Sequence, residues 1–136
     1  MHERALIDTS VVIELEAIDP AGLPGEMAVS AITLAELAAG PHATDDADER
    51  ARRQDRLQRA QGLFDPLPFD GDAARAYGRV FAAVRGAGRK ARGRRFADLL
   101  IAATALAAGL PIYTRNPADF DCLRKLVEVV AVETSR

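Results

Sequence analysis

The segment RRFADLLIAATALAAG, residues 94–109, decides the fold of this chain. From Phe96 to Ala108 almost every side chain is apolar, and Ala and Leu dominate, so we predict a helix that is buried on all sides. Asp98 interrupts this segment in its predicted first turn. A carboxylate that enters a core is costly unless a partner or a metal ion neutralises it. An Asp in a first turn also complements the helix dipole, so this segment alone leaves a structural and a functional role open.

The composition is that of one soluble globular domain. A chain of 136 residues can build a real core, and 49% hydrophobic with 28% charged residues excludes a disordered chain. No apolar run reaches the roughly 18 residues of a membrane span, and no secretory signal is visible. We therefore expect a single domain, residues 1–136, in the cytoplasm and without a membrane partner. The lone Cys122 excludes a disulfide framework and a cysteine-based zinc site within one chain.

Positive charge is concentrated directly before the Asp98 segment, although the net charge of the chain is only −2. Residues 85–95 contain six basic residues and no acidic residue: Arg85, Arg89, Lys90, Arg92, Arg94 and Arg95. Such a segment can bind the phosphates of a nucleic acid, or it can be a solvated loop. The sequence leaves both interpretations open.

Two other predicted elements bring acidic residues into apolar surroundings. Residues 5–7 predict a short strand that ends at Asp8, where open α/β sheets bind their ligands, although Asp8 can equally cap the next helix. Ser30 predicts the start of a helix that the pair Gly40-Pro41 stops. Glu36 lies in the middle of that helix, and by itself we interpret it as a solvent-facing residue.

The remaining segments complete an alternation of strands and helices. We predict strands at 27–29, 110–114 and within 127–132. Helices are predicted at 45–61 and 72–84, and the first of them is exposed and carries the ion pairs Asp48–Arg52 and Glu49–Arg53. The connector at 64–70 can hold a short edge strand. Strands that alternate with helices indicate βαβ units and a parallel sheet.

Several common α/β chemistries are excluded by missing motifs. The chain lacks a P-loop, a dinucleotide-binding G-x-G-x-x-G and a nucleophile elbow. With only His2 and His42, a histidine acid–base pair or a histidine-rich metal site is not expected.

The chemistry that remains is that of carboxylates. Asp8, Glu36 and Asp98, together with Asn116 and Asp119 after the strand at 110–114, can converge at one edge of a parallel sheet. Acids that converge repel each other, and a hard cation such as Mg²⁺ or Mn²⁺ relieves the repulsion. Such a site suits metal-assisted attack of water on a phosphodiester.

Four motifs, in the order LIDTSV, ITLAELAAG, RRFADLLIAATAL and IYTRNPADF, resemble those of PIN-domain ribonucleases, specifically the VapC-type toxins of toxin–antitoxin pairs. The resemblance covers almost the whole chain, and the combination of motifs is specific. It implies a three-layer α/β/α sandwich with a mainly parallel sheet and a Mg²⁺-dependent endoribonuclease. It also implies a homodimer and inhibition by a small cognate antitoxin.

The resemblance also implies roles for individual residues. Asp8 and Asp98 match the principal metal ligands, and Glu36 completes the cluster or orients the attacking water. Many relatives have Asp directly after Thr-Arg, where this chain has Asn116, and Asp119 is close enough to supply the missing charge. The hydroxyls of Ser10 and Thr114 would hold the acids in place.

Two alternatives stay open at this point. One is a nuclease of the same fold that acts on DNA or in RNA processing. The other is a non-catalytic binding module in which the acids only cap helices.

Overall fold

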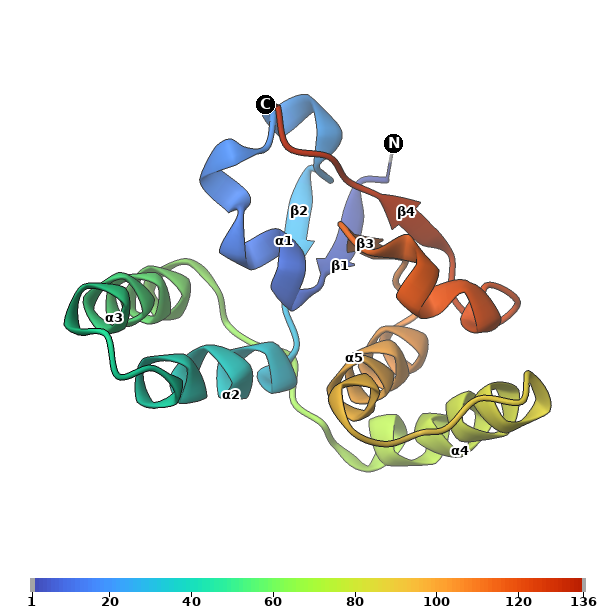
Figure 1. The fold of residues 1–136 in the computed structure, drawn as a ribbon. Coiled ribbons are helices and arrows are strands. Elements are labelled where there is room, and N and C mark those ends of the chain that lie inside the picture. Colours follow the sequence, from blue (N-terminus) through green and yellow to red (C-terminus); the bar gives the residue numbers. More distant parts are fainter. Residues whose placement is uncertain (1, 136) are drawn as a thin grey trace.

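The structure is a computed structural model that describes residues 2–135, and at Arg94 the backbone alone. Its central element is a four-stranded sheet with the strand order β2-β1-β3-β4 (Figure 1). The strands are β1 (Arg4–Ile7), β2 (Glu26–Ala28), β3 (Ile112–Thr114) and β4 (Val129–Ala131). All neighbouring strands are parallel, so their carboxyl ends lie at the same edge of the sheet.

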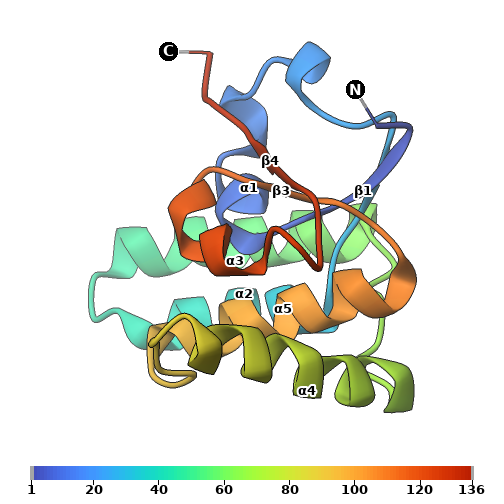
Figure 2. The same cartoon turned by 90° about the vertical axis from the view of Figure 1, so that its right-hand side faces the viewer.

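Successive strand residues point to opposite faces of the sheet and so build two separate cores. Leu6 and Ile112 face α4 (Gly71–Gly86) and α5 (Arg94–Ala108), and Ile7 and Tyr113 belong to the core on the other face. That second core includes residues of α1 (Thr9–Ile13), α2 (Ala31–Ala39) and α3 (Ala47–Leu63). Figure 1 shows α3 to the left of the sheet and α4 and α5 below it. In Figure 2 the strands lie above α5, and α5 lies above α4. The expected three-layer sandwich with a parallel sheet is confirmed.

Helix α5 begins two residues before the apolar run and ends where it was predicted to end. Gly93 precedes it with φ 70°, and Gly109 closes it in the left-handed conformation at φ 68°, a region that glycine enters without strain. The early start places Asp98 in the second turn, so the predicted first-turn position is wrong. Burial on all sides is also wrong at the start of the helix, where Phe96 is 45% exposed.

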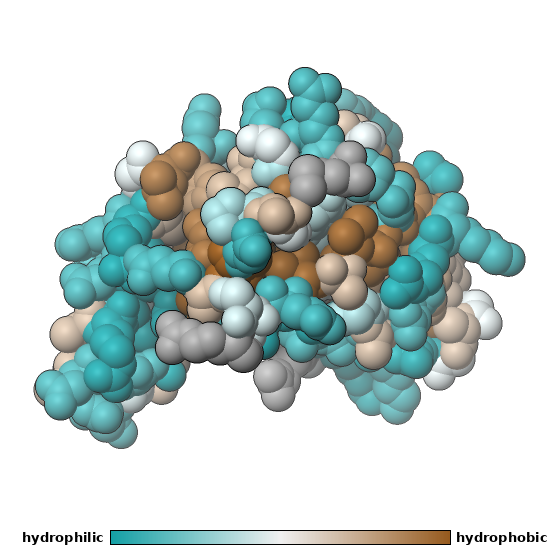
Figure 3. Space-filling view, turned by 90° about the horizontal axis from the view of Figure 1, so that it is seen from above, coloured by the Kyte–Doolittle hydropathy of each residue, from teal (hydrophilic) through white to brown (hydrophobic). Residues whose placement is uncertain are grey.

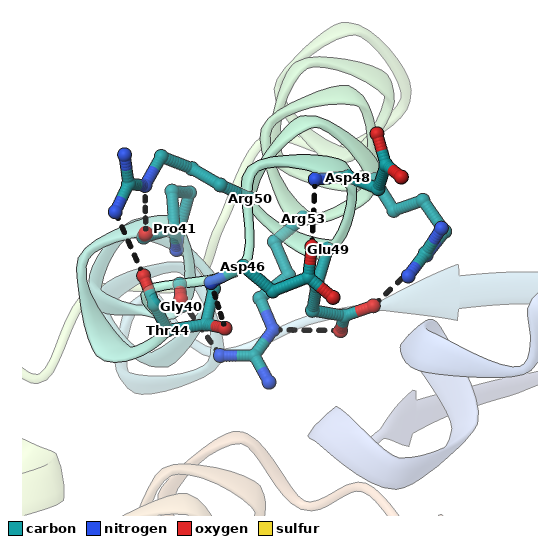
Figure 4. Close-up of polar contacts among 9 residues, drawn as sticks. Gly40, Pro41, Thr44, Asp46, Asp48, Glu49, Arg50 and Arg53 are labelled. Carbon is teal, nitrogen blue, oxygen red and sulfur yellow. Dashed lines mark hydrogen bonds and ion pairs between the residues drawn. The ribbon is translucent and has the colours of Figure 1, made fainter.

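The end of α2 differs from the expected glycine stop. Gly40 has right-handed helical angles, φ −51° and ψ −50°, and the chain continues into the 3-10 helix η3 (Gly40–Ala43). Arginines of α3 satisfy the carbonyl groups at this corner (Figure 4). Arg53 Nη1 donates to the carbonyl of Gly40 at 2.9 Å, and Arg50 Nε donates to that of Pro41 at 3.2 Å. The α-helix does end at Ala39, directly before the predicted Gly40-Pro41 pair, but it does so without a left-handed residue.

Helix α3 is charged along most of its length, as predicted. The expected pair of Glu49 with Arg53 is present at 2.8 Å, but Arg52 pairs with Glu49 at 2.9 Å and not with Asp48. In Figure 3 hydrophilic residues cover the left side, where α3 lies in Figure 1, and apolar residues gather near the middle of that face.

The remaining elements are short. They are the 3-10 helices η1 (Leu15–Ala17), η2 (Pro20–Gly22) and η4 (Pro117–Leu123). The suspected edge strand in the connector at 64–70 is a single parallel bridge between Leu67 and Ser30. None of the helices within residues 2–135 combines the length and the apolar character that a membrane span requires.

Candidate functional site

A cavity of about 510 Å³ opens among α2, α5 and the segment that follows β3. Four of the predicted site residues line it: Glu36, Asp98, Asn116 and Asp119. The other lining residues are Gly93, Arg95 and Ala97. These residues come from three elements that are far apart in the sequence. The parallel sheet brings them together because β1 and β3 end at this edge and α5 starts there.

Asp8, the fifth predicted residue, follows β1 directly and is only 4% exposed. Its Oδ1 accepts hydrogen bonds from Ser10 Oγ at 2.6 Å and from the backbone N–H of Val11 at 3.2 Å. Asp8 therefore caps α1, as one of its two expected roles required. Burial raises the pKa of its carboxyl group, although hydrogen bonds from Ser10 and Thr114 act in the opposite direction.

The carboxyl group of Asp98, which lines the cavity, is perturbed by its surroundings. Burial, and after it the negative charges of Asp119, Asp8 and Glu36 in that order, together raise its pKa from 3.8 to about 6. Arg95 acts in the opposite direction. Because three acids from different elements act on one carboxyl group, the predicted acids share one electrostatic site. A perturbed acid in a cavity is typical of functional sites.

Glu36 is exposed to solvent, as its helix position suggested, yet its side chain is held in place. Thr9 Oγ1 donates a hydrogen bond of 2.6 Å to Glu36 Oε1 and lies 3.0 Å from the hydroxyl of Thr33. Neither threonine was among the predicted site residues. Their positions in the sequence could have indicated a role beside the acids, because Thr9 follows Asp8 directly and Thr33 lies one helical turn before Glu36.

A second group of hydroxyls ties the turn after β3 to the start of α1. Ser10 Oγ accepts from the backbone N–H of Arg115 at 3.0 Å and lies 3.5 Å from Thr114 Oγ1. Thr114 Oγ1 accepts from the backbone N–H of Asn116 at 3.0 Å. Ser10 therefore positions both the Asp8 carboxylate and the segment that carries Asn116.

Of the described side chains in the predicted basic segment, one lines the cavity. Arg95 lines the cavity, whereas Arg89, Lys90 and Arg92 are exposed in the loop before α5. The side chain of Arg94 lies outside the described residues.

The acids fit a hard divalent cation by their chemistry but do not form a closed cage. Within residues 2–135, no group of three acidic, histidine or cysteine side chains is arranged to hold a metal ion. The available donors at the cavity are oxygen atoms with excess negative charge, which Mg²⁺ prefers. Mg²⁺ commonly keeps several water ligands and uses one or two carboxylates. The arrangement therefore suits a hydrated ion on one or two carboxylates.

A PIN domain model matches residues 5–125 of the chain. The chain belongs to the PIN-domain family. Ribonuclease VapC5 from Mycobacterium tuberculosis is 36% identical over 132 residues, which cover 93% of this chain and 94% of the relative. VapC ribonuclease Y4jK from Sinorhizobium fredii is 36% identical over 131 residues, with 85% and 89% covered. This PIN domain therefore belongs with the VapC ribonucleases, and the resemblance seen in its four motifs is confirmed.

Solved structures agree with this placement of the PIN domain. The crystal structure of VapBC-5, a member of the VapBC family of toxin–antitoxin systems from Mycobacterium tuberculosis, matches with a TM-score of 0.83 at 36% identity. The match covers 96% of this chain and 99% of that chain. The PIN domain match over residues 5–125 includes all five predicted site residues.

Proposed function

We propose that this PIN domain is a metal-dependent endoribonuclease and the toxin of a toxin–antitoxin pair, which cleaves RNA phosphodiesters by activated water. The observation that carries the proposal is the convergence of Asp8, Glu36, Asp98 and Asp119 on one site, where burial and the three other acids raise the pKa of Asp98. The identity to two VapC ribonucleases over most of the chain supports RNA as the substrate.

Asp8 and Asp98 would hold the metal ion, Mg²⁺ or Mn²⁺. When bound, such an ion lowers the pKa of a coordinated water and polarises a phosphate oxygen. Asp8 suits this role because Ser10 and Val11 fix its Oδ1. Asp98 suits it because a carboxylate crowded by other acids gains most from a cation.

Glu36 would orient the attacking water and accept its proton. Thr9 occupies Oε1 with a 2.6 Å hydrogen bond, which leaves Oε2 for the water. At the fourth position, Asp119 would supply the negative charge that Asn116 lacks, since the charge of Asp119 raises the pKa of Asp98. Asn116 would contribute its carbonyl oxygen to the same cavity.

The proposed protein partner is a small cognate antitoxin. VapBC-5, which shares this fold at a TM-score of 0.83, is a member of a toxin–antitoxin family. On this chain, a groove of about 450 Å³ between the α1–η1 segment and α3 exposes apolar side chains, with Ile13 41% and Leu63 67% exposed. Glu16 and Arg59 flank it. Such a groove suits an amphipathic antitoxin segment. Homodimer formation and a cytoplasmic location stay predictions.

The test is cleavage by purified, antitoxin-free protein. Total RNA, single-stranded DNA and duplex DNA are each incubated with Mg²⁺ or with chelator, for wild type and for Asp98→Asn. The matched control is Asp121→Asn, because Asp121 is an exposed acid of η4 that pairs with Arg124 at 3.0 Å and does not line the cavity. We expect discrete RNA products that require Mg²⁺ and Asp98, and normal activity in the control. Equal activity of wild type and Asp98→Asn would refute the proposal, and efficient DNA cleavage would favour a nuclease other than an RNA-cleaving toxin.

A further inference from the structure

Arg95 brings a positive charge into the acidic cavity. It is the second residue of α5, and among the described side chains that line this cavity it is the only basic one. Its Nη1 donates a hydrogen bond of 3.2 Å to the backbone carbonyl of Asp119. This bond joins the start of α5 to η4 and holds the guanidinium group at the cavity.

The guanidinium group of Arg95 is not saturated by the protein. It carries five N–H donors in a planar fork, and within residues 2–135 the bond to Asp119 is its one hydrogen bond, with no ion pair to a carboxylate. Its charge is nevertheless close enough to lower the pKa of Asp98. Arg95 is therefore near the acids while most of its donors remain free for a ligand.

The positive charge of Arg95 can offset the repulsion between the acids of the cavity and the phosphates of an RNA backbone. An RNA backbone that approaches Glu36, Asp98 and Asp119 meets charges of its own sign, and one hydrated metal ion offsets only part of them. An arginine fork binds two phosphate oxygens at once, which fixes orientation as well as position. The exposed cations at 89, 90 and 92 attract RNA in general, but they do not line the cavity.

We propose that Arg95 binds a phosphate of the substrate RNA at the acidic cavity and so positions the scissile bond against Asp98 and Glu36. The inference rests on the proposed function for its substrate. Phosphate binding by Arg95 differs from a structural role, in which Arg95 would only hold η4 in place or neutralise the acids. A structural role predicts changes in stability or metal affinity with no change in the salt dependence of RNA binding, whereas phosphate binding predicts a change in that salt dependence.

The test compares Arg95→Gln and Arg95→Lys with wild type. The matched control is Arg4→Gln, which removes the same charge from an exposed side chain at the amino end of β1, on the opposite edge of the sheet. Binding of a fluorescein-labelled single-stranded RNA oligonucleotide is measured by anisotropy in chelator at several salt concentrations. Thermal melting of each variant establishes that it is folded.

We expect Arg95→Gln to weaken RNA binding about 5–10-fold and to reduce the slope of log K against log salt by about 0.7, the contribution of one contact to a single strand. Arg95→Lys keeps the slope, because it keeps the charge, but cleaves RNA more slowly, because lysine lacks the fork. Mg²⁺ affinity of Arg95→Gln, measured by calorimetry, is unchanged or tighter.

An unchanged slope for folded Arg95→Gln overturns the inference, and so does an equal loss in Arg4→Gln. If wild-type protein binds RNA but does not cleave it with Mg²⁺, the proposed function fails, while the slopes still decide the role of Arg95. If wild-type protein cleaves RNA with Mg²⁺ but binds none of the oligonucleotide in chelator, the inference is overturned while the proposed function stands.

Discussion

Replacement of Asp98 by Asn is expected to stabilise the metal-free protein. Burial and three neighbouring acids raise the pKa of Asp98 from 3.8 to about 6. The folded state therefore binds this proton more tightly than the unfolded chain, and the ionised carboxylate opposes folding. The cost is fully present above about pH 6, fades as the pH falls through 6 toward 3.8, and is absent below. Asn keeps the shape of the side chain and removes the charge.

The size of the effect follows from the same pKa. A difference of about two pH units corresponds to about 3 kcal/mol at neutral pH. The side chain is only partly buried, so solvent screening reduces the gain, and we expect about 1–2 kcal/mol. For a domain of this size, such a gain raises the melting temperature by about 4–8 °C.

Thermal melting in chelator at pH 7.5 and at pH 4 measures this prediction. Asp98→Asn should melt above wild type at pH 7.5 and lose most of that advantage at pH 4, whereas the exposed control Asp121→Asn should gain little at either pH. Addition of Mg²⁺ should raise the melting temperature of wild type more than that of Asp98→Asn, since ligands stabilise the state that binds them. A lower melting temperature for Asp98→Asn at pH 7.5, or an equal advantage at both pH values, would refute the electrostatic argument.

Three further substitutions test the contacts that support the site. Thr9→Val removes the hydrogen bond to Glu36 and should lower kcat for RNA cleavage about 10-fold. Thr9→Ser keeps a hydroxyl group and should recover the rate. A wild-type rate in Thr9→Val would show that Glu36 does not need this hydrogen bond. Ser10→Ala leaves the buried Asp8 carboxylate with fewer donors, so urea unfolding should show a loss of about 1–3 kcal/mol, and no loss would contradict the contact. Arg53→Met should cost about 1 kcal/mol and speed amide hydrogen exchange at the end of α2, whereas unchanged exchange there would mean that the Gly40 carbonyl needs no such donor.

Local rules were enough to predict the order of elements and several helix ends. Asp8 and Ser30 accept the capping hydrogen bonds that their positions before helices predicted, and Gly109 adopts the left-handed conformation at the end of α5. The Gly40-Pro41 pair correctly marked the end of α2, but Gly40 is not left-handed, and arginines of α3 satisfy the carbonyl groups there. Local sequence patterns carry no information about a hydrogen-bond donor that another helix supplies.

The sequence by itself determined the alternation of strands and helices and the acidic residues that stand out against apolar surroundings. Both follow from periodicity and from the cost of burying charge, which act over a few residues. Only the tertiary structure decided that the acids act on one another at a shared cavity, that Thr9 holds Glu36, and that Arg95 reaches the cavity whereas Arg92 does not. Electrostatic interactions and hydrogen bonds depend on distance in space, and the parallel sheet sets those distances between segments that are remote along the chain.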